Sequence, residues 1–188
     1  MSLFELWSTH DWVVKTLMLA FAFATVVILE KIVQLIRIAR IVATKEPNAL
    51  DTLEHPHIRS CITSIQSFKD EKEALFNANV GVQLDKIENY MMRYVGIVGL
   101  IAVLSPMLGL IGTFFGVWHV FEGVGSFGLN EPGVIARGIK EVLIDTMVGL
   151  GVAVYATIGY KLLELWIRKL SIAFEEKVYL FLGERHAS

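Results

Sequence analysis

Two long apolar runs decide how this chain folds. Val95–Phe121 reads VGIVGLIAVLSPMLGLIGTFFGVWHVF, and Val142–Tyr160 reads VLIDTMVGLGVAVYATIGY. At about 1.5 Å per helical residue, each run is about long enough to cross a hydrocarbon core of roughly 30 Å. Small and polar residues interrupt both runs, and a helix that only had to dissolve in lipid would not need them. We therefore expect helices that pack closely on other helices and line something polar.

The composition is typical of a small multi-span membrane protein. Of the 188 residues, 54% are hydrophobic, and the mean hydropathy is +0.56. The net charge of −2 gives no basic surface for nucleic acid, and the single cysteine, Cys61, excludes an internal disulfide. The sequence contains no nucleophile elbow, phosphate loop or zinc-ligand spacing. These features predict neither an enzyme nor a bound cofactor.

The hydropathy pattern predicts an all-α protein with three transmembrane helices. The expected segments are an N-terminal arm (1–11), a first span (12–36), a helical loop (37–93), a second span (94–121), a short loop (122–133), a third span (134–166) and a C-terminal helix (167–188). No breaker separates the amphipathic stretch Phe68–Tyr94 from the second span, so we expect one continuous helix there. The last two spans should both extend beyond the membrane on the same side.

Lysine and arginine are distributed unevenly over the expected loops. The segments 1–11 and 122–133 carry none, whereas 37–93 and the tail after the third span carry many. Basic residues gather on the cytoplasmic side of membrane proteins. The bias predicts a periplasmic N-terminus and a cytoplasmic C-terminus.

Small and hydroxyl-bearing residues form a stripe along the second span. Four of them are spaced by four, four and three residues and so share one helix face: Ser105, Gly109, Thr113 and Gly116. Gly112 and Gly116 form a small-xxx-small pattern. Pro106 removes the backbone donor that would normally bond the Ala102 carbonyl, which then needs protein or water nearby. The stripe predicts either a hydrated path or a close helix–helix seam.

Acidic residues mark the third span. Glu141, Asp145 and Gly149 share one face, and Thr146 lies on an adjacent face about 100° away. A carboxylate in mid-membrane costs at least about 2.5 kcal/mol, so Asp145 should face protein or water. One interpretation is a hydrated path for protons or cations, lined by Thr113, Thr146, Glu141 and Asp145. The alternatives are an interfacial Glu141 paired with Arg137, and a salt bridge from Asp145 to another helix, with Lys15 as one candidate.

Both motifs resemble those of a known family. Ser105–Gly116, SPMLGLIGTFFG, is similar to the second-span motif of the TolQ/ExbB/MotA proton-channel proteins, in which Ala-Pro precedes Gly-Leu-x-Gly-Thr and a further Gly. Gly138–Leu150, GIKEVLIDTMVGL, resembles their third-span Gly-Ile-x-Glu-Ala-Leu-x-x-Thr-x-x-Gly-Leu. The order and spacing of the two motifs match as well. The short cytoplasmic loop favours the TolQ/ExbB branch over the flagellar MotA branch.

The resemblance implies a stator subunit of a motor in the bacterial inner membrane. Subunits of this family form a homopentamer around two copies of a single-span TolR- or ExbD-like partner, which brings an aspartate into the pore. Passage of protons, with Na⁺ as the alternative ion, drives force transmission to the periplasm or outer membrane, and TonB- or TolA-like proteins are further expected partners. The competing hypothesis is a non-conducting oligomeric membrane scaffold.

The resemblance also implies roles for individual residues of this chain. Thr113 and Thr146 match the pore threonines, and Glu141 matches the third-span glutamate of the family. The matching helix-packing positions are Ser105, Pro106, Gly109, Gly112, Gly116 and Gly149. Three residues depart from the family pattern: Asp145 stands where a small residue is usual, Tyr155 replaces a common proline, and Lys161 stands where asparagine is common. We therefore expect either a more acidic pore or a different choice of ion, and the family's proline kink in the third span does not transfer to this chain.

Overall fold

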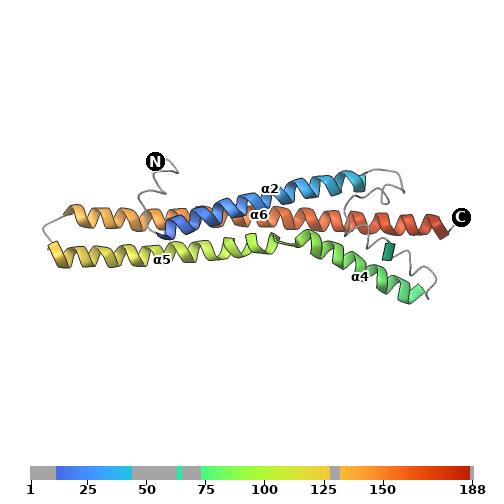
Figure 1. Cartoon of the computed structure of the whole chain (residues 1–188), viewed down its shortest axis with the longest axis horizontal. Coiled ribbons are helices and arrows are strands. Elements are labelled where there is room, and N and C mark those ends of the chain that lie inside the picture. Colours follow the sequence, from blue (N-terminus) through green and yellow to red (C-terminus); the bar gives the residue numbers. More distant parts are fainter. Residues whose placement is uncertain (1–11, 44–62, 65–72, 128–131, 187–188) are drawn as a thin grey trace. The chain divides into compact units, whose positions relative to one another are not determined.

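The computed structural model describes residues 12–43, 63–64, 73–127 and 132–186, and four long helices account for nearly all of them (Figure 1). These are α2 (Trp12–Ala43), α4 (Glu73–Met92), α5 (Val95–Phe127) and α6 (Pro132–His186). The chain divides into two compact units. The first comprises Met1–Ile28 and Gly96–Tyr160, and the second comprises Leu29–Val95 and Lys161–Ser188.

Three of the helices are long and apolar enough to cross a membrane. The stretches that meet this criterion are Trp12–Arg40, Val95–Gly123 and Ile135–Val178. The expectation of an all-α protein with three spanning helices is therefore confirmed. The helices run past the expected span limits, since α5 continues to Phe127 and α6 begins at Pro132. Proline is favoured at the first position of a helix, where its missing N–H needs no partner.

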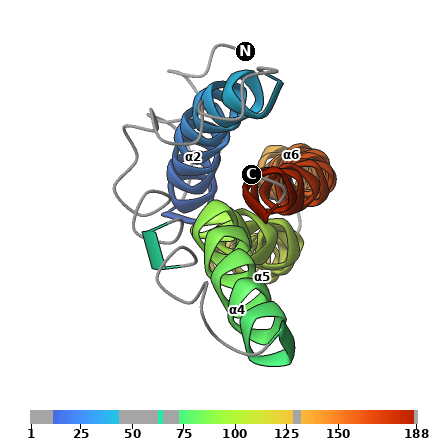
Figure 2. The same ribbon diagram turned by 90° about the vertical axis from the view of Figure 1, so that its right-hand side faces the viewer.

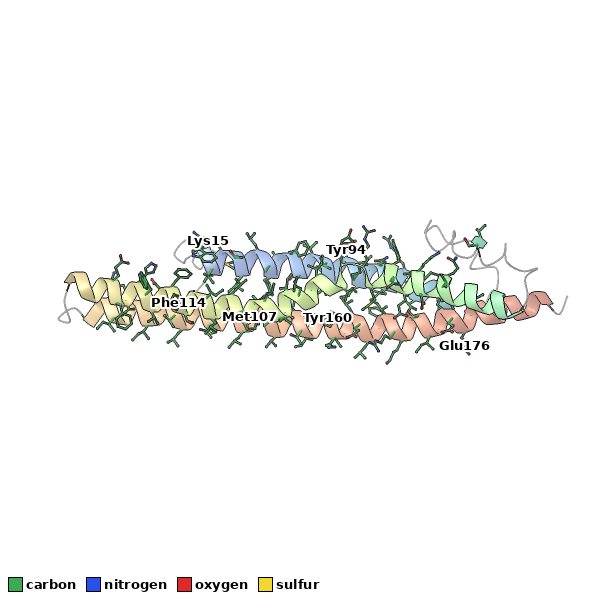
Figure 3. The ribbon with its side chains drawn as sticks, turned by 90° about the horizontal axis from the view of Figure 1, so that it is seen from below. Lys15, Tyr94, Met107, Phe114, Tyr160 and Glu176 are labelled. Atoms are coloured by element: carbon green, nitrogen blue, oxygen red, sulfur yellow. The ribbon has the colours of Figure 1, made fainter. Side chains whose placement is uncertain are left out.

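The prediction of one continuous helix from the loop into the second span is wrong, because the structure has two separate helices there. Residues 68–72 lie outside the described residues, and the helix that follows, α4, ends at Met92. Tyr94 then has a φ of 68°, in the left-handed region, and α5 starts at Val95. A left-handed residue cannot continue a right-handed helix and is a common way to end one. Tyr94 is labelled in Figure 3.

The third span, by contrast, is one uninterrupted helix. α6 runs from Pro132 to His186 without internal proline. A proline at position 155 would remove a helical hydrogen bond and bend the helix. With Tyr155 there instead, α6 continues through this position without a break.

The first unit has a small apolar core made by α2, α5 and α6. Val13, Leu17 and Val152 are almost fully buried, and Ile101 and Val148 pack around them. Outside this core, large apolar side chains of α5 and α6 are exposed: Leu110 is 69% exposed and Met147 68%. Such surfaces need lipid or further helices against them. They support a multi-pass membrane protein.

Candidate functional site

In the first unit α5 and α6 run antiparallel and meet along a seam of glycines (Figures 1 and 2). Among the glycines of this seam, an added Cβ at Gly149 comes nearest to backbone atoms of the facing helix: it would stand 2.8 Å from the Ser105 carbonyl oxygen and 3.0 Å from the Gly109 Cα. An added Cβ at Gly109 would in turn stand 3.0 Å from the Asp145 carbonyl oxygen. Only residues without side chains allow two helices to approach this closely.

Asp145 lies inside this seam. Its exposed fraction is only 2%. A Cβ on Gly112 would stand 2.8 Å from the Asp145 Cβ and 2.9 Å from its Cγ. The carboxylate therefore occupies the space that a side chain at position 112 would need. The absence of a side chain at position 112 explains how this carboxylate is accommodated between the two helices.

The seam continues toward the end that carries the short connection between the two helices. An added Cβ at Gly116 would stand 2.6 Å from Val142 Cγ2, and one at Gly138 would overlap the Val120 side chain. Gly138 was not among the packing residues predicted from the sequence. It precedes Asp145 by seven residues, which is about two helical turns, so the same spacing rule would have found it.

Ser105 and Pro106 lie near the other end of the seam. Ser105 is 1% exposed, and its Oγ donates a hydrogen bond to the Ile101 carbonyl oxygen at 2.6 Å. Pro106 lies inside α5, where it leaves the Ala102 carbonyl without its usual helical donor. The structure thus brings together Ser105, Gly109, Gly112, Gly116 and Gly149 as helix-packing positions.

The two threonines lie beside the seam. Thr113 follows Gly112 and Thr146 follows Asp145, so each is rotated by about 100° from the seam on its own helix. Because the helices are antiparallel, both rotations lead to the same edge of the α5–α6 pair. Thr113 Oγ1 donates to the Leu110 carbonyl oxygen at 2.6 Å, and Thr146 Oγ1 donates to that of Val142 at 3.1 Å. Both threonines remain partly exposed.

Helix α2 packs on the opposite edge of the pair. The ring centroids of Trp12 and Phe115 are 5.9 Å apart, and those of Phe21 and Tyr155 are 4.8 Å apart. Around α5, Phe115 lies on the side of the seam opposite to Thr113. Around α6, Tyr155 likewise lies on the side opposite to Thr146. The threonine edge therefore faces away from the only other spanning helix in the part of the chain that the structure describes.

Glu141 is half-buried and lies on the α2 side of the seam. It precedes Asp145 by four residues, a rotation of about 40° away from Thr146. The common face of Glu141, Asp145 and Gly149 follows from helical spacing alone and stays a prediction. Within one chain, however, the seam separates Glu141 from the two threonines. Among the described residues no group of three or more His, Cys, Asp or Glu could hold a metal ion.

Comparison with known proteins identifies the class. Residues 49–176, more than half of the chain, match the model of the MotA/TolQ/ExbB proton channel family. The chain therefore belongs to this family.

Individual relatives carry the names ExbB and TolQ. The chain is 37% identical over 87 residues to biopolymer transport protein exbB1 of Vibrio cholerae, covering 46% of this chain and 38% of the relative. It is 34% identical over 76 residues to ExbB of Salmonella typhimurium, covering 40% and 31%. With the Tol-Pal system protein TolQ of Haemophilus influenzae it shares 30% identity over 94 residues, covering 50% and 40%. The match thus spans less than half the length of each of these relatives.

Proposed function

We propose that this protein is a proton-conducting stator subunit of an inner-membrane motor of the ExbB/TolQ type. The observation that carries the proposal is the position of Thr113 and Thr146 on one edge of the α5–α6 pair, away from α2. Each hydroxyl donates to its own helix, and a hydroxyl oxygen can still accept a hydrogen bond from water. A row of such oxygens is suited to hold a chain of water molecules in a narrow pore.

The conducting form is proposed to be a homopentamer. Five copies arranged with their threonine edges inward would enclose an axis lined by ten threonines, with α2 on the outside against lipid. The exposed apolar faces of α5 and α6 would then meet neighbouring subunits or lipid. In this arrangement Glu141 of every subunit would lie on the α2 side of the seam, away from the central axis. A role for Glu141 in ion passage is therefore proposed at the mouth of the pore and not along its threonine-lined part.

A single-span TolR- or ExbD-like protein is the proposed partner within the pore. Asp145 is buried in the seam, and threonine hydroxyls do not change protonation state near neutral pH. The pore therefore needs a carboxylate that can cycle between protonated and charged forms, and the partner's aspartate would supply it. Protons are the proposed ion, with Na⁺ as the alternative. The N-terminus would be periplasmic and the C-terminus cytoplasmic, and a TonB- or TolA-like protein would receive the force.

The close seam itself favours one competing function. Glycines at 109, 112, 116 and 149 bring the helices together, and the threonine hydroxyls bond to their own backbone. Both features would also suit a non-conducting oligomeric scaffold. A flagellar MotA-like stator is a further alternative within the family.

Proton flux into vesicles distinguishes these functions. The chain and its single-span partner are reconstituted together, and the fluorescence of a pH-sensitive dye inside the vesicles is followed after a potential is imposed. Thr146→Val should reduce flux at least about tenfold, because it removes a water-holding oxygen without changing shape. Thr25→Val is the matched control, since the Thr25 hydroxyl also bonds to its own helix, to the Phe21 carbonyl oxygen at 2.8 Å, but on α2. Equal flux in the two variants would favour the scaffold.

A further inference from the structure

An open groove lies on α2 and α4 within the second unit. It has a volume of about 480 Å³, and its lining residues are Leu29, Glu30, Val33, Gln34, Arg37 and Tyr90. All of them belong to one compact unit. We infer that this groove binds one phospholipid with an anionic headgroup, its phosphate on Arg37 and its acyl chain along Leu29 and Val33.

The lining changes from apolar to charged along α2. Leu29 and Val33 are 58% and 51% exposed, and Arg37 follows one turn later. At about 1.5 Å per residue, Leu29 comes about 26 Å and Arg37 about 38 Å after Trp12 along the helix. The hydrocarbon core is roughly 30 Å thick. The groove therefore spans the boundary at which a phospholipid changes from acyl chain to headgroup.

Cations outnumber anions around the polar end. Lys31 is only 4% exposed and donates a hydrogen bond from Nζ to Oε1 of Gln34, a lining residue of the groove, at 2.9 Å. Lys31 Nζ also lies 6.0 Å from the centroid of the Tyr90 ring. Glu30 and Arg93 are both close enough to interact electrostatically with Lys31. Among the described residues that line the groove or interact with Lys31, there are thus three cations, Lys31, Arg37 and Arg93, and one carboxylate, that of Glu30.

Charge complementarity selects the occupant. A protein chain or a second copy would have to bring both an apolar segment and an anion to this depth of the membrane. A phospholipid carries both in one molecule, since its acyl chains are apolar and its phosphate is an anion. Planar guanidinium groups such as that of Arg37 bind phosphate oxygens through paired N–H donors. Each basic residue near a membrane surface contributes about 1 kcal/mol to the attraction of anionic lipid. The groove should therefore prefer phosphatidylglycerol over phosphatidylcholine.

The experiment counts lipids retained by the full-length protein. The protein is reconstituted in vesicles of equimolar phosphatidylglycerol and phosphatidylcholine and extracted in mild detergent, and native mass spectrometry measures the ratio of the two lipids still bound. Arg37→Gln should lower this ratio about fivefold, which corresponds to about 1 kcal/mol. Arg37→Lys should retain most of the preference, because the charge remains. Arg40→Gln is the control, since Arg40 is an exposed arginine of the same helix that does not line the groove.

Each outcome bears on the inference. A loss of preference in Arg37→Gln alone, with recovery in Arg37→Lys, supports the lipid site. An equal loss in Arg37→Gln and Arg40→Gln overturns it, because the preference would then reflect general surface charge. No loss in either variant overturns it as well. Displacement of the retained lipid by excess inorganic phosphate would show a simple anion site instead. None of these results depends on proton conduction.

Discussion

Asp145 of α6 packs its carboxyl group against Gly112 of α5, in the space that a side chain at position 112 would occupy. The two residues depend on each other, since the carboxylate is buried only because the glycine has no Cβ. This contact fixes the register of α5 against α6, and that register in turn places Thr113 and Thr146 on one edge of the pair.

The contact predicts a strong penalty for Gly112→Ala. The new methyl would overlap the Asp145 side chain, so the free energy of unfolding should fall by about 1–3 kcal/mol, as for other overpacked sites. Adding Asp145→Ala should recover part of the loss, because the two changes act on one contact. Titration with sodium dodecyl sulfate in mixed micelles, followed by circular dichroism, measures this. Gly96→Ala is the control, because an added Cβ there meets nothing within 4 Å. Equal stabilities of Gly112→Ala and Gly96→Ala would refute the contact.

Two nearby glycines of α6 offer a second matched comparison. Gly149 stands against the backbone of α5, whereas an added Cβ on Gly151 meets nothing within 4 Å. Gly149→Ala should separate the helices and lower stability by about 1–3 kcal/mol. Gly151→Ala should raise stability by up to about 1 kcal/mol, because alanine favours the helix. The same unfolding titration ranks the two, and the reverse order would mean that the seam lies on another face of α6.

Hydropathy and helical spacing were sufficient to predict the three candidate spans and the stripe of small residues that α5 presents to α6. They could not predict which surface each face meets, because a helix face packs equally well against a second helix of the same chain, a neighbouring subunit or water. For that reason the sequence leaves Asp145 open between a hydrated path and a salt bridge to another helix. The structure buries its side chain against Gly112. The ion-pathway roles of Thr113, Thr146, Glu141 and Asp145 stay predictions.

The break between α4 and α5 could not be predicted because it contains neither glycine nor proline. Arg93 donates its backbone N–H to the Tyr90 carbonyl oxygen at 3.3 Å, and its guanidinium carbon lies 4.9 Å from the centroid of the Tyr94 ring. A stacked pair of this kind is worth about 0.5–1 kcal/mol and offsets part of the cost of a left-handed tyrosine. Local sequence rules do not include such a pairing of side chains at a turn.

The left-handed conformation of Tyr94 predicts that glycine at this position gives a more stable protein than valine. Tyr94→Val should lower the free energy of unfolding by at least about 1 kcal/mol relative to Tyr94→Gly, because β-branched residues are strained at positive φ and glycine is not. Asn89→Val and Asn89→Gly, at an exposed position inside α4, should show the opposite order, since glycine is the poorer helix residue there. Urea unfolding of the detergent-solubilised protein tests this. Finding Tyr94→Val the more stable of its pair would mean that the helix continues through residue 94.

Ser171 of α6 predicts a stabilising substitution. Its Oγ is buried without a hydrogen-bond partner in the part of the chain that the structure describes. Ser171→Ala removes this unsatisfied group and should raise the free energy of unfolding by about 1 kcal/mol. Ser105→Ala is the contrast, because the Ser105 hydroxyl donates to the Ile101 carbonyl oxygen, so its removal should bring no such gain. Thermal unfolding of both variants gives the comparison, and a loss of stability in Ser171→Ala would show that its hydroxyl is satisfied.

The most direct test of the proposed pathway asks whether water reaches the threonine edge in the assembled protein. In a Cys61→Ser background, which has no other cysteine, Thr146→Cys and Met147→Cys are each exposed to a charged, membrane-impermeant thiol reagent after reconstitution with the partner. Met147 is 68% exposed in the isolated chain and lies on the far side of α6 from the seam. We expect rapid labelling at position 146 and little at 147, because only the former would line a hydrated axis. Labelling at 147 with protection at 146 would place the threonines against lipid or a dry interface, and would contradict the proton-channel function.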